Sequence, residues 1–377
     1  MDLGLVIYGS LDSLTGGYIY DRILVDYLRQ CGHRVDIISL DPRNYVRHFM
    51  DGFSRALRSK LIHSVYDILL QDELNHPSLG RINRILKRKT NFPIVAIVHQ
   101  VLCSQPRNRL LNRIYKAVET HYLKSVDAFI FNSHTTRQTV EALVNCRQSS
   151  MVAWPAGDRL GHLPSPDLIR SRAHADGSLR LVFVGNVLPH KGLTPLIRGL
   201  SNLSSVPWHL SIVGSLSMNP PHVRRIRKLI DRLNLSRQIE LEGPKDGAEL
   251  ASHLARSHVF VMPYSREGFG MAHLEAMAFA LPVIGSSTGA VKEFVIPGQN
   301  GFLIDPGDTK TVNDCINRLH QDRQMLIRMS RTAWQTFYDR PKWKDTMEAI
   351  EGFLIRLRRI NPPKADRGLI IRPLGRL

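Results

Sequence analysis

Short apolar runs alternate with longer amphipathic segments along most of the chain. These runs are five to seven residues long and mostly aliphatic or β-branched, and they predict strands at 3–8, 34–40, 92–98, 128–133, 179–185, 208–214, 239–243 and 259–263. Helical spacing of apolar residues predicts helices between them, most clearly at 18–31 and 271–280. Because regular alternation of strands and helices is typical of parallel sheets, we expect an α/β protein.

The apolar pattern is interrupted over residues 155–178, where six prolines and glycines lie among few apolar positions. A chain of 377 residues also exceeds the size that one hydrophobic core usually serves. We therefore predict two domains, residues 1–160 and 179–342, joined by a linker at 161–178.

The stretch from Val259 onward combines a buried strand, a glycine-containing loop and a helix that should end before Pro282. In such units the loop after the strand faces the ligand crevice, and the start of the helix favours anions. Gly268 and Gly270 allow positive φ and a close approach of backbone N–H groups to a ligand. This stretch is therefore the first candidate for a binding site.

Two carboxylates lie in this unit, Glu267 in the loop and Glu275 in the helix. A carboxylate can accept two hydrogen bonds from a vicinal diol such as a ribose or a pyranose. The alternative is that Glu267 only places a charge at the helix start and Glu275 is a solvated surface residue. The apolar neighbours of Glu275, Leu274 and Met277 among them, favour a functional role.

Other candidates also follow predicted strands. Gly16 and Gly17 precede the first helix, and His99 ends the strand at 92–98. The glycine pair could equally be a plain turn, and His99 a polar residue that closes its strand. Gly185, Asn186 and Lys191 lie in the loop after 179–185, where a lysine is suited to a diphosphate. No dinucleotide fingerprint opens the first helix.

The formal net charge of +18 predicts attraction to an anionic partner: nucleic acid, a membrane surface or a phosphorylated ligand. Residues 81–124 contain ten Lys or Arg against one acid. Two basic amphipathic segments, 48–62 and 81–89, could lie on an anionic membrane or pack on the core with a solvated face. We expect no nucleic-acid partner, because no recognised motif and no aromatic interleaving accompany these charges.

The four cysteines are scattered and form no Cys-x-x-Cys pair, so we expect reduced thiols rather than zinc sites or disulfides. The sequence contains no apolar run long enough to span a membrane, and its start lacks the charged region of a signal peptide. We therefore expect a cytoplasmic protein, with the possibility of peripheral attachment to the inner face of the membrane.

The motif Glu267-Gly-Phe-Gly-x4-Glu275 resembles the E-x7-E signature of the retaining family-4 glycosyltransferases of GT-B fold. Thr288-Gly289, Glu293 and Gly298-x2-Gly301 also fall where that family has a glycine-rich turn, a glutamate and a strand entry. The resemblance implies two Rossmann-like domains whose parallel sheets face a central cleft. It also implies a helix at 343–360 that crosses back to the first domain, after which 361–377 forms a basic, loosely ordered tail.

The resemblance implies a retaining, metal-independent hexosyltransferase that needs no cofactor beyond its nucleotide-diphosphate sugar. Glu267, His99 and Lys191 would be the catalytic residues, and Glu275 would bind the ribose. The remaining donor-contacting residues would be Gly16, Gly17, Gly185, Asn186, Gly268, Phe269 and Gly270. Asn186 stands where the family usually has an arginine, so one positive charge on the diphosphate is missing.

The acceptor would be a glycan, a lipid-linked molecule or a small molecule. Two alternatives to the transferase remain: a sugar-nucleotide epimerase or hydrolase on the same fold, and an inactive protein of this fold that binds anionic surfaces. If the protein is a transferase, we expect it to act in polysaccharide or glycolipid biosynthesis.

Overall fold

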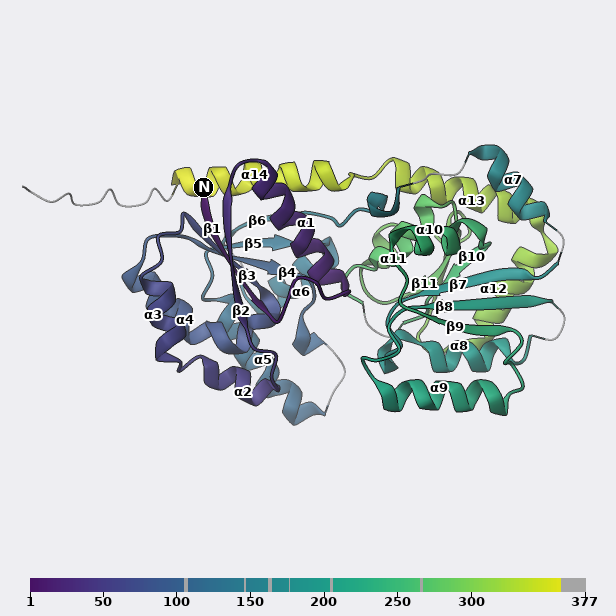
Figure 1. The fold of residues 1–377 in the computed structure, drawn as a ribbon, viewed down its shortest axis with the longest axis horizontal. Coiled ribbons are helices and arrows are strands. Elements are labelled where there is room, and N and C mark those ends of the chain that lie inside the picture. The colour runs from purple at the N-terminus through teal and green to yellow at the C-terminus, as the bar shows by residue number, and fades with distance from the viewer. Residues whose placement is uncertain are drawn as a thin grey trace, which may run out of the picture. The chain divides into compact units, whose positions relative to one another are not determined.

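The protein is described by a computed structural model that covers residues 1–104, 108–145, 147–161, 165–175, 177–203, 206–264 and 267–360 (Figure 1). Cys146 and the predicted tail at 361–377 lie outside the described residues. By their contacts, the residues form two compact units. Unit 1 comprises Met1–Asn132, Thr136–Ala153 and the chain from Met347, and unit 2 comprises Ser133–Thr135 and Trp154–Thr346.

Unit 1 is built on a six-stranded parallel sheet of strand order β2-β1-β3-β4-β5-β6. Its strands are β1 (Asp2–Tyr8), β2 (Arg34–Leu40), β3 (Ile68–Asp72), β4 (Ile94–Val98), β5 (Ala128–Phe131) and β6 (Ser149–Val152). Its helices are α1 (Gly16–Gln30), α2 (Tyr45–Asp51), α3 (Arg55–Ile62), α4 (His76–Lys89), α5 (Arg109–Leu123) and α6 (His134–Leu143), with short 3-10 turns η1 (Glu73–Asn75) and η2 (Leu102–Ser104). Figure 1 shows α4 and α5 on one side of this sheet and α1 on the other.

Unit 2 contains a second six-stranded parallel sheet, of order β12-β11-β10-β7-β8-β9. Its strands are β7 (Leu179–Val184), β8 (Trp208–Val213), β9 (Ile239–Gly243), β10 (Val259–Val261), β11 (Val283–Ser286) and β12 (Gly301–Ile304). Its helices are α7 (Pro166–His174), α8 (Leu193–Leu200), α9 (Pro220–Arg232), α10 (Gly247–Arg256), α11 (Met271–Ala278), α12 (Thr309–Gln321) and α13 (Arg323–Tyr338), with turns η3 (Asp158–Leu160), η4 (Pro189–Lys191) and η5 (Ala290–Glu293). The prediction of parallel α/β sheets is confirmed in both units.

The last helix, α14 (Trp343–Ile360), belongs to unit 1 from Met347 onward. Within unit 1 its Glu351 lies 2.7 Å from His33, and its Arg358 forms an ion pair of 2.9 Å with Asp67. The segment predicted as a linker includes α7, which lies in unit 2. Arg172 on α7 donates hydrogen bonds to the backbone carbonyls of Phe279 and Ala280, so this helix is held against the end of α11.

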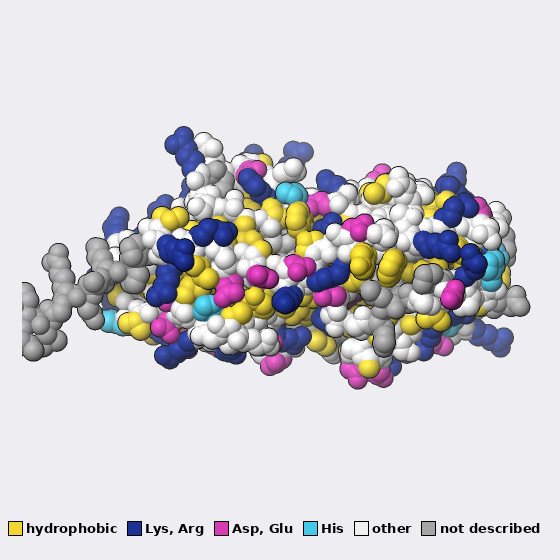
Figure 2. Space-filling model, turned by 90° about the horizontal axis from the view of Figure 1, so that it is seen from above, with side chains coloured by type: hydrophobic (Ala, Val, Ile, Leu, Met, Phe, Trp, Pro, Cys, Tyr) yellow, Lys and Arg dark blue, Asp and Glu magenta, His cyan; other side chains and the backbone are white. Residues whose placement is uncertain are grey.

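The structure decides between the two interpretations for one of the two basic segments. In α4 the apolar side chains Ile82 and Leu86 are fully buried in the core of unit 1, so this helix packs on the sheet and exposes its charges. The apolar side chains of the segment 48–62 differ in burial: Leu61 is buried, whereas Phe49 and Phe53 are exposed. In the view of Figure 2, Lys and Arg side chains are spread among acidic and hydrophobic ones and form no single continuous patch. Within the described chain, no helix has both the length and the hydropathy needed to cross a membrane.

Candidate functional site

The candidate residues of unit 2 lie at the carboxyl ends of two adjacent strands, β7 and β10. Lys191 ends the turn η4 after β7, and Glu267 lies between β10 and α11. Gly192, which follows Lys191, has a φ of 80°, and a Cβ there would come within 2.2 Å of the carbonyl oxygen of Pro263. Only glycine permits this approach, which brings the loop after β7 against the end of β10.

Lys191 and Glu267 form an ion pair through Nζ and Oε2. Burial would raise the pKa of Glu267, but the charge and hydrogen bond of Lys191 outweigh it and the pKa is lowered. The two side chains are 16% and 22% exposed, so both can be reached by a ligand. At neutral pH the pair therefore presents an ammonium group and an ionised carboxylate side by side.

The loop that leads into α11 presents its backbone rather than its side chains. Gly270 has a φ of 91° and immediately precedes the helix, whereas Gly268 is not among the glycines with positive φ. Phe269 is 3% exposed and its ring lies 5.3 Å from that of Phe294. The Phe269 side chain thus anchors the loop in the core, and the loop can meet a ligand through the peptide groups next to the N-terminus of α11.

Glu275 is almost completely buried, which contradicts its alternative interpretation as a solvated surface residue. Its Oε1 accepts a hydrogen bond of 2.9 Å from Nε of Arg159, and Nη2 of Arg159 lies 2.8 Å from the same oxygen. Both contacts of the guanidinium go to one carboxylate oxygen. Arg159 therefore fixes the orientation of Glu275 while contacting only one of its two oxygens.

Sequence reasoning missed Arg159, which lies 116 residues before Glu275 in a turn that gave no periodic signal. The turn is seated closely on α11: a Cβ on Gly157 would lie 2.7 Å from the carbonyl oxygen of Leu274. In the sequence, this contact is indicated only by Gly157, two residues before Arg159, in a segment with few apolar residues.

Gly185 and Asn186 begin the loop after β7. The Gly185 N–H donates to the carbonyl of Val213, and Oδ1 of Asn186 accepts a hydrogen bond of 3.1 Å from the N–H of Ser215. Asn186 thus ties the loops after β7 and β8 together. This hydrogen bond is made by a neutral amide. In the family that the sequence resembles, the same position usually holds a charged arginine.

In unit 1, Gly17 and His99 are brought into contact. A Cβ on Gly17 would lie 3.2 Å from Cδ2 of His99, so a larger residue would press on the imidazole. Gly16 is the first residue of α1, two residues earlier than the predicted start of that helix. The carbonyl oxygen of His99 accepts a hydrogen bond of 2.7 Å from Nδ2 of Asn132, which holds the backbone at the end of β4.

His99 has a buried acidic partner that sequence reasoning missed. Nε2 of His99 lies 2.9 Å from Oδ1 of Asp21, which is fully buried on α1. Burial alone would lower the pKa of His99, but the charges of Asp21 and Asp72 outweigh it and raise the pKa. Asp21 follows Gly17 by one helical turn, a spacing that could have signalled a common face.

The chain matches two family models. Residues 165–336 match the model described as glycosyl transferases group 1, and residues 20–157 match that of glycosyltransferase family 4. A curated relative, D-inositol 3-phosphate glycosyltransferase of Kineococcus radiotolerans, is 24% identical over 302 residues, which are 75% of this chain and 64% of the relative. The chain thus spans less than two thirds of that relative's length.

Solved structures share the fold over nearly the whole chain. Sucrose-phosphate synthase from Thermosynechococcus elongatus superposes with a TM-score of 0.81 at 20% identity, covering 95% of this chain and 99% of that one. Anabaena HepE in complex with UDP-glucose gives 0.75 at 18% identity, covering 94% and 100%. The predicted GT-B fold is thereby confirmed.

Proposed function

We propose that this chain, which belongs to the family-4 glycosyltransferases of GT-B fold, is a retaining transferase that moves a sugar from a nucleotide-diphosphate donor to an acceptor. The observation that carries the proposal is the arrangement of Glu275, Glu267 and Lys191 at the carboxyl ends of the unit 2 strands. Glu275 is buried, oriented by Arg159 and surrounded by apolar residues. A solvated surface charge would need neither the burial nor the arginine.

Each group of unit 2 has a role that fits its chemistry. The Glu275 carboxylate would accept hydrogen bonds from the two ribose hydroxyls. Lys191 and the N-terminus of α11 would hold the diphosphate. Glu267, ionised beside Lys191, would accept hydrogen bonds from the hydroxyls of the donor sugar. Asn186, which accepts a hydrogen bond from the N–H of Ser215, would hold the loop after β7 in place but add no charge to the site.

The chemical step places negative charge on the leaving diphosphate as the glycosidic bond breaks. Positively charged groups and peptide N–H groups that are already in place stabilise that charge without reorganisation. In unit 1, His99, held by Asp21 and packed against Gly17, would be the residue that contacts the reacting sugar. We assign no covalent nucleophile, because retention by front-face attack requires none.

The proposal is tested by a thermal-shift screen of the purified protein with UDP-, GDP- and ADP-sugars. We expect one nucleotide class to raise the melting temperature, because a ligand that binds only the folded state stabilises it. UDP-glucose is the first probe, since HepE has been solved with it. A protein that responds to no nucleotide sugar would contradict the proposal.

Product analysis then separates the enzymes that would share this response. With a bound donor and candidate glycan or lipid-linked acceptors, a transferase releases the nucleoside diphosphate and forms a glycoside. A hydrolase instead releases free sugar without an acceptor, and an epimerase releases a changed sugar nucleotide. Binding without any turnover would support the inactive, surface-binding alternative.

We also propose that the acceptor is met at an anionic lipid surface, through a face formed by α2 and α5 of unit 1. The two helices are joined by stacking of Tyr45 on Tyr115, with ring centroids 4.0 Å apart. The two helices expose six large apolar side chains, and Phe53, just after α2, adds a seventh: Val46, Phe49, Met50, Leu110, Leu111 and Ile114 lie on the helices. Exposed basic residues lie on the same two helices and at the start of α3: Arg47, Arg109, Arg113, Lys116 and Arg55. Apolar side chains flanked by cations are the composition that binds anionic membrane surfaces.

Flotation with lipid vesicles tests this face. We expect the protein to float with vesicles rich in phosphatidylglycerol and not with phosphatidylcholine alone, because the cations contribute to binding. Replacing Phe49 and Leu110 by serine should weaken the partition about tenfold, since each loses apolar area that enters the interface. Val65→Ser, at an exposed site of the same unit, is the matched control. Equal flotation of the double variant and the wild type would refute the assignment of this face.

A further inference from the structure

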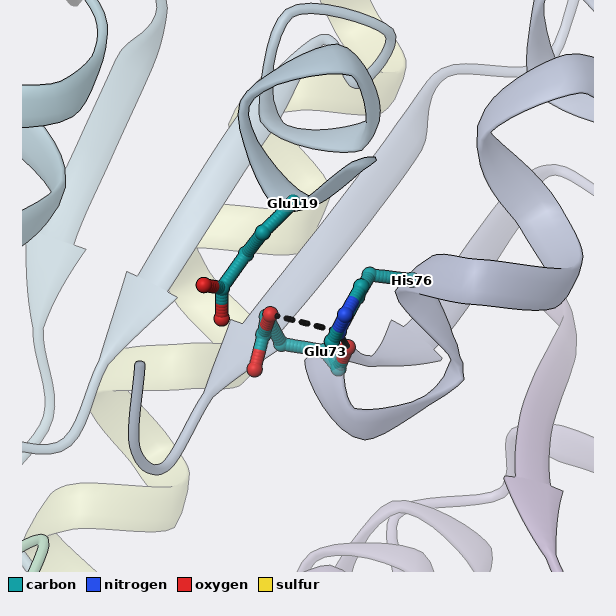
Figure 3. A group of neighbouring side chains, drawn as sticks. All are labelled: Glu73, His76 and Glu119. Carbon is teal, nitrogen blue, oxygen red and sulfur yellow. Dashed lines mark hydrogen bonds and ion pairs between the residues drawn. The ribbon is translucent and has the colours of Figure 1, made fainter. Parts of the chain in front are cut away.

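Unit 1 contains a buried cluster of two carboxylates and an imidazole that the proposed reaction does not use. Glu73 lies in η1 directly after β3, His76 begins α4, and Glu119 lies on α5 (Figure 3). Their exposed fractions are 1%, 1% and 0%, and one ligand atom from each lies within 4.8 Å of the others. Of the three elements that carry the cluster, α4 packs against both η1 and α5, and Figure 3 shows the three side chains pointing toward one another.

The two carboxylates of the cluster are held very differently. Both oxygens of Glu119 accept backbone hydrogen bonds, from the N–H of Leu102 at 2.6 Å and of Cys103 at 2.8 Å. These donors favour the ionised form and fix the carboxylate in place. Neither oxygen of Glu73 accepts a hydrogen bond from a donor among the described residues, although both are buried. Glu73 is therefore a buried carboxylate that points into the cluster, where its Oε1 faces Nδ1 of His76.

Two carboxylates that face each other out of water repel one another when both are ionised. They are stable together when they share a proton or when a cation lies between them. His76 lies close enough to contribute, with Nδ1 3.1 Å from Oε1 of Glu73. Either a shared proton or a metal ion would neutralise these facing groups.

The donor set favours a metal ion. Two carboxylates and one imidazole, with the glutamate and histidine three residues apart, match the ligands that Zn²⁺, Mn²⁺ and Fe²⁺ accept in proteins. Nε2 of His76 lies 3.0 Å from the hydroxyl of Tyr45, and Nδ1 lies 3.1 Å from the backbone carbonyl oxygen of Glu73. Binding of a metal ion through Nδ1 would therefore replace the contact between Nδ1 and this carbonyl. A ligating histidine with its second nitrogen held in this way is typical of protein metal sites.

We propose that Glu73, His76 and Glu119 bind one divalent transition-metal ion inside unit 1. The ion neutralises the two carboxylates and links the turn after β3 to α5 and to the loop that contains Leu102 and Cys103. Because all three ligands are buried, the ion binds as the unit folds and contributes to its stability. The site is structural, and it lies in unit 1, whereas the Lys191–Glu267 pair lies in unit 2.

Metal content and melting temperature of the full chain test the proposal. The protein is unfolded with EDTA, refolded with Zn²⁺, Mn²⁺ or no metal, and desalted. We expect about one ion per chain to be retained with Zn²⁺ or Mn²⁺, and a melting temperature about 5 °C above that of the metal-free protein. Glu73→Gln keeps the shape of the side chain and should abolish both effects, while His63→Gln, at an exposed histidine of the same unit, should leave both unchanged.

Two results would overturn the proposal. Retention of no metal by the wild type would show that a shared proton neutralises the cluster. In that case Glu73→Gln should melt at or above the wild-type temperature, because its amide can donate to Glu119. Equal retention by Glu73→Gln and the wild type would place the ion elsewhere, at one of the other histidines of the chain.

Discussion

Replacing Lys191 by methionine is expected to lower kcat/KM for the donor by about 10²–10³-fold, the loss typical of removing one preorganised group that stabilises developing charge. Methionine keeps much of the length of the lysine and removes its charge. The effect should be large because Asn186, in the same loop after β7, is neutral. Lys191 alone would then supply the positive charge from this loop that stabilises the leaving diphosphate. Steady-state kinetics of nucleoside diphosphate release measures the change.

The matched control is Lys228→Met, which removes an exposed lysine from α9 of the same unit and the same amount of net charge. Its kcat/KM should equal that of the wild type. The double variant Lys191→Met/Glu267→Gln should lose much less than the product of the two single losses, because the paired side chains act as one unit. Strictly multiplicative losses, or an unaffected Lys191→Met, would refute the joint role of the pair.

The second large effect is expected at Glu275. Glu275→Ala removes the hydrogen bonds that the carboxylate would accept from two ribose hydroxyls, each worth about 1.5–3 kcal/mol, so nucleotide affinity should fall by at least about 10²-fold. The same change leaves the Arg159 guanidinium without its carboxylate, which should lower the free energy of unfolding by roughly 3 kcal/mol. Isothermal titration with UDP, GDP and ADP and urea unfolding measure the two quantities.

Arg159→Met separates binding from stability. It leaves the Glu275 carboxylate in place but without its orienting partner, so its loss of stability should resemble that of Glu275→Ala while its loss of affinity is smaller. Glu275→Gln, which retains the shape of the side chain, should recover part of the stability and little of the affinity. Nucleotide binding by Glu275→Ala at wild-type strength would rule out the ribose contact.

Local patterns in the sequence predict most of the strands and the motif of unit 2, but they fail where the tertiary structure overrides them. The strand β3 was missed because its five residues end in Gln71 and Asp72, which a periodicity argument reads as surface residues. Both are fully buried at the centre of the sheet, between β1 and β4. The buried cluster that follows β3 was consequently missed as well.

By itself, the sequence determines the α/β class, the resemblance to family 4 and the identity of the chemical groups after each strand. These features are encoded within segments of about 30 residues or fewer, through apolar period, glycine placement and the spacing of two glutamates. Only the tertiary structure decides what those groups contact. Arg159 reaches Glu275 across 116 residues, and Asp21 reaches His99 across 78. Such contacts form when elements far apart in the chain pack together in the folded unit, so no local period records them.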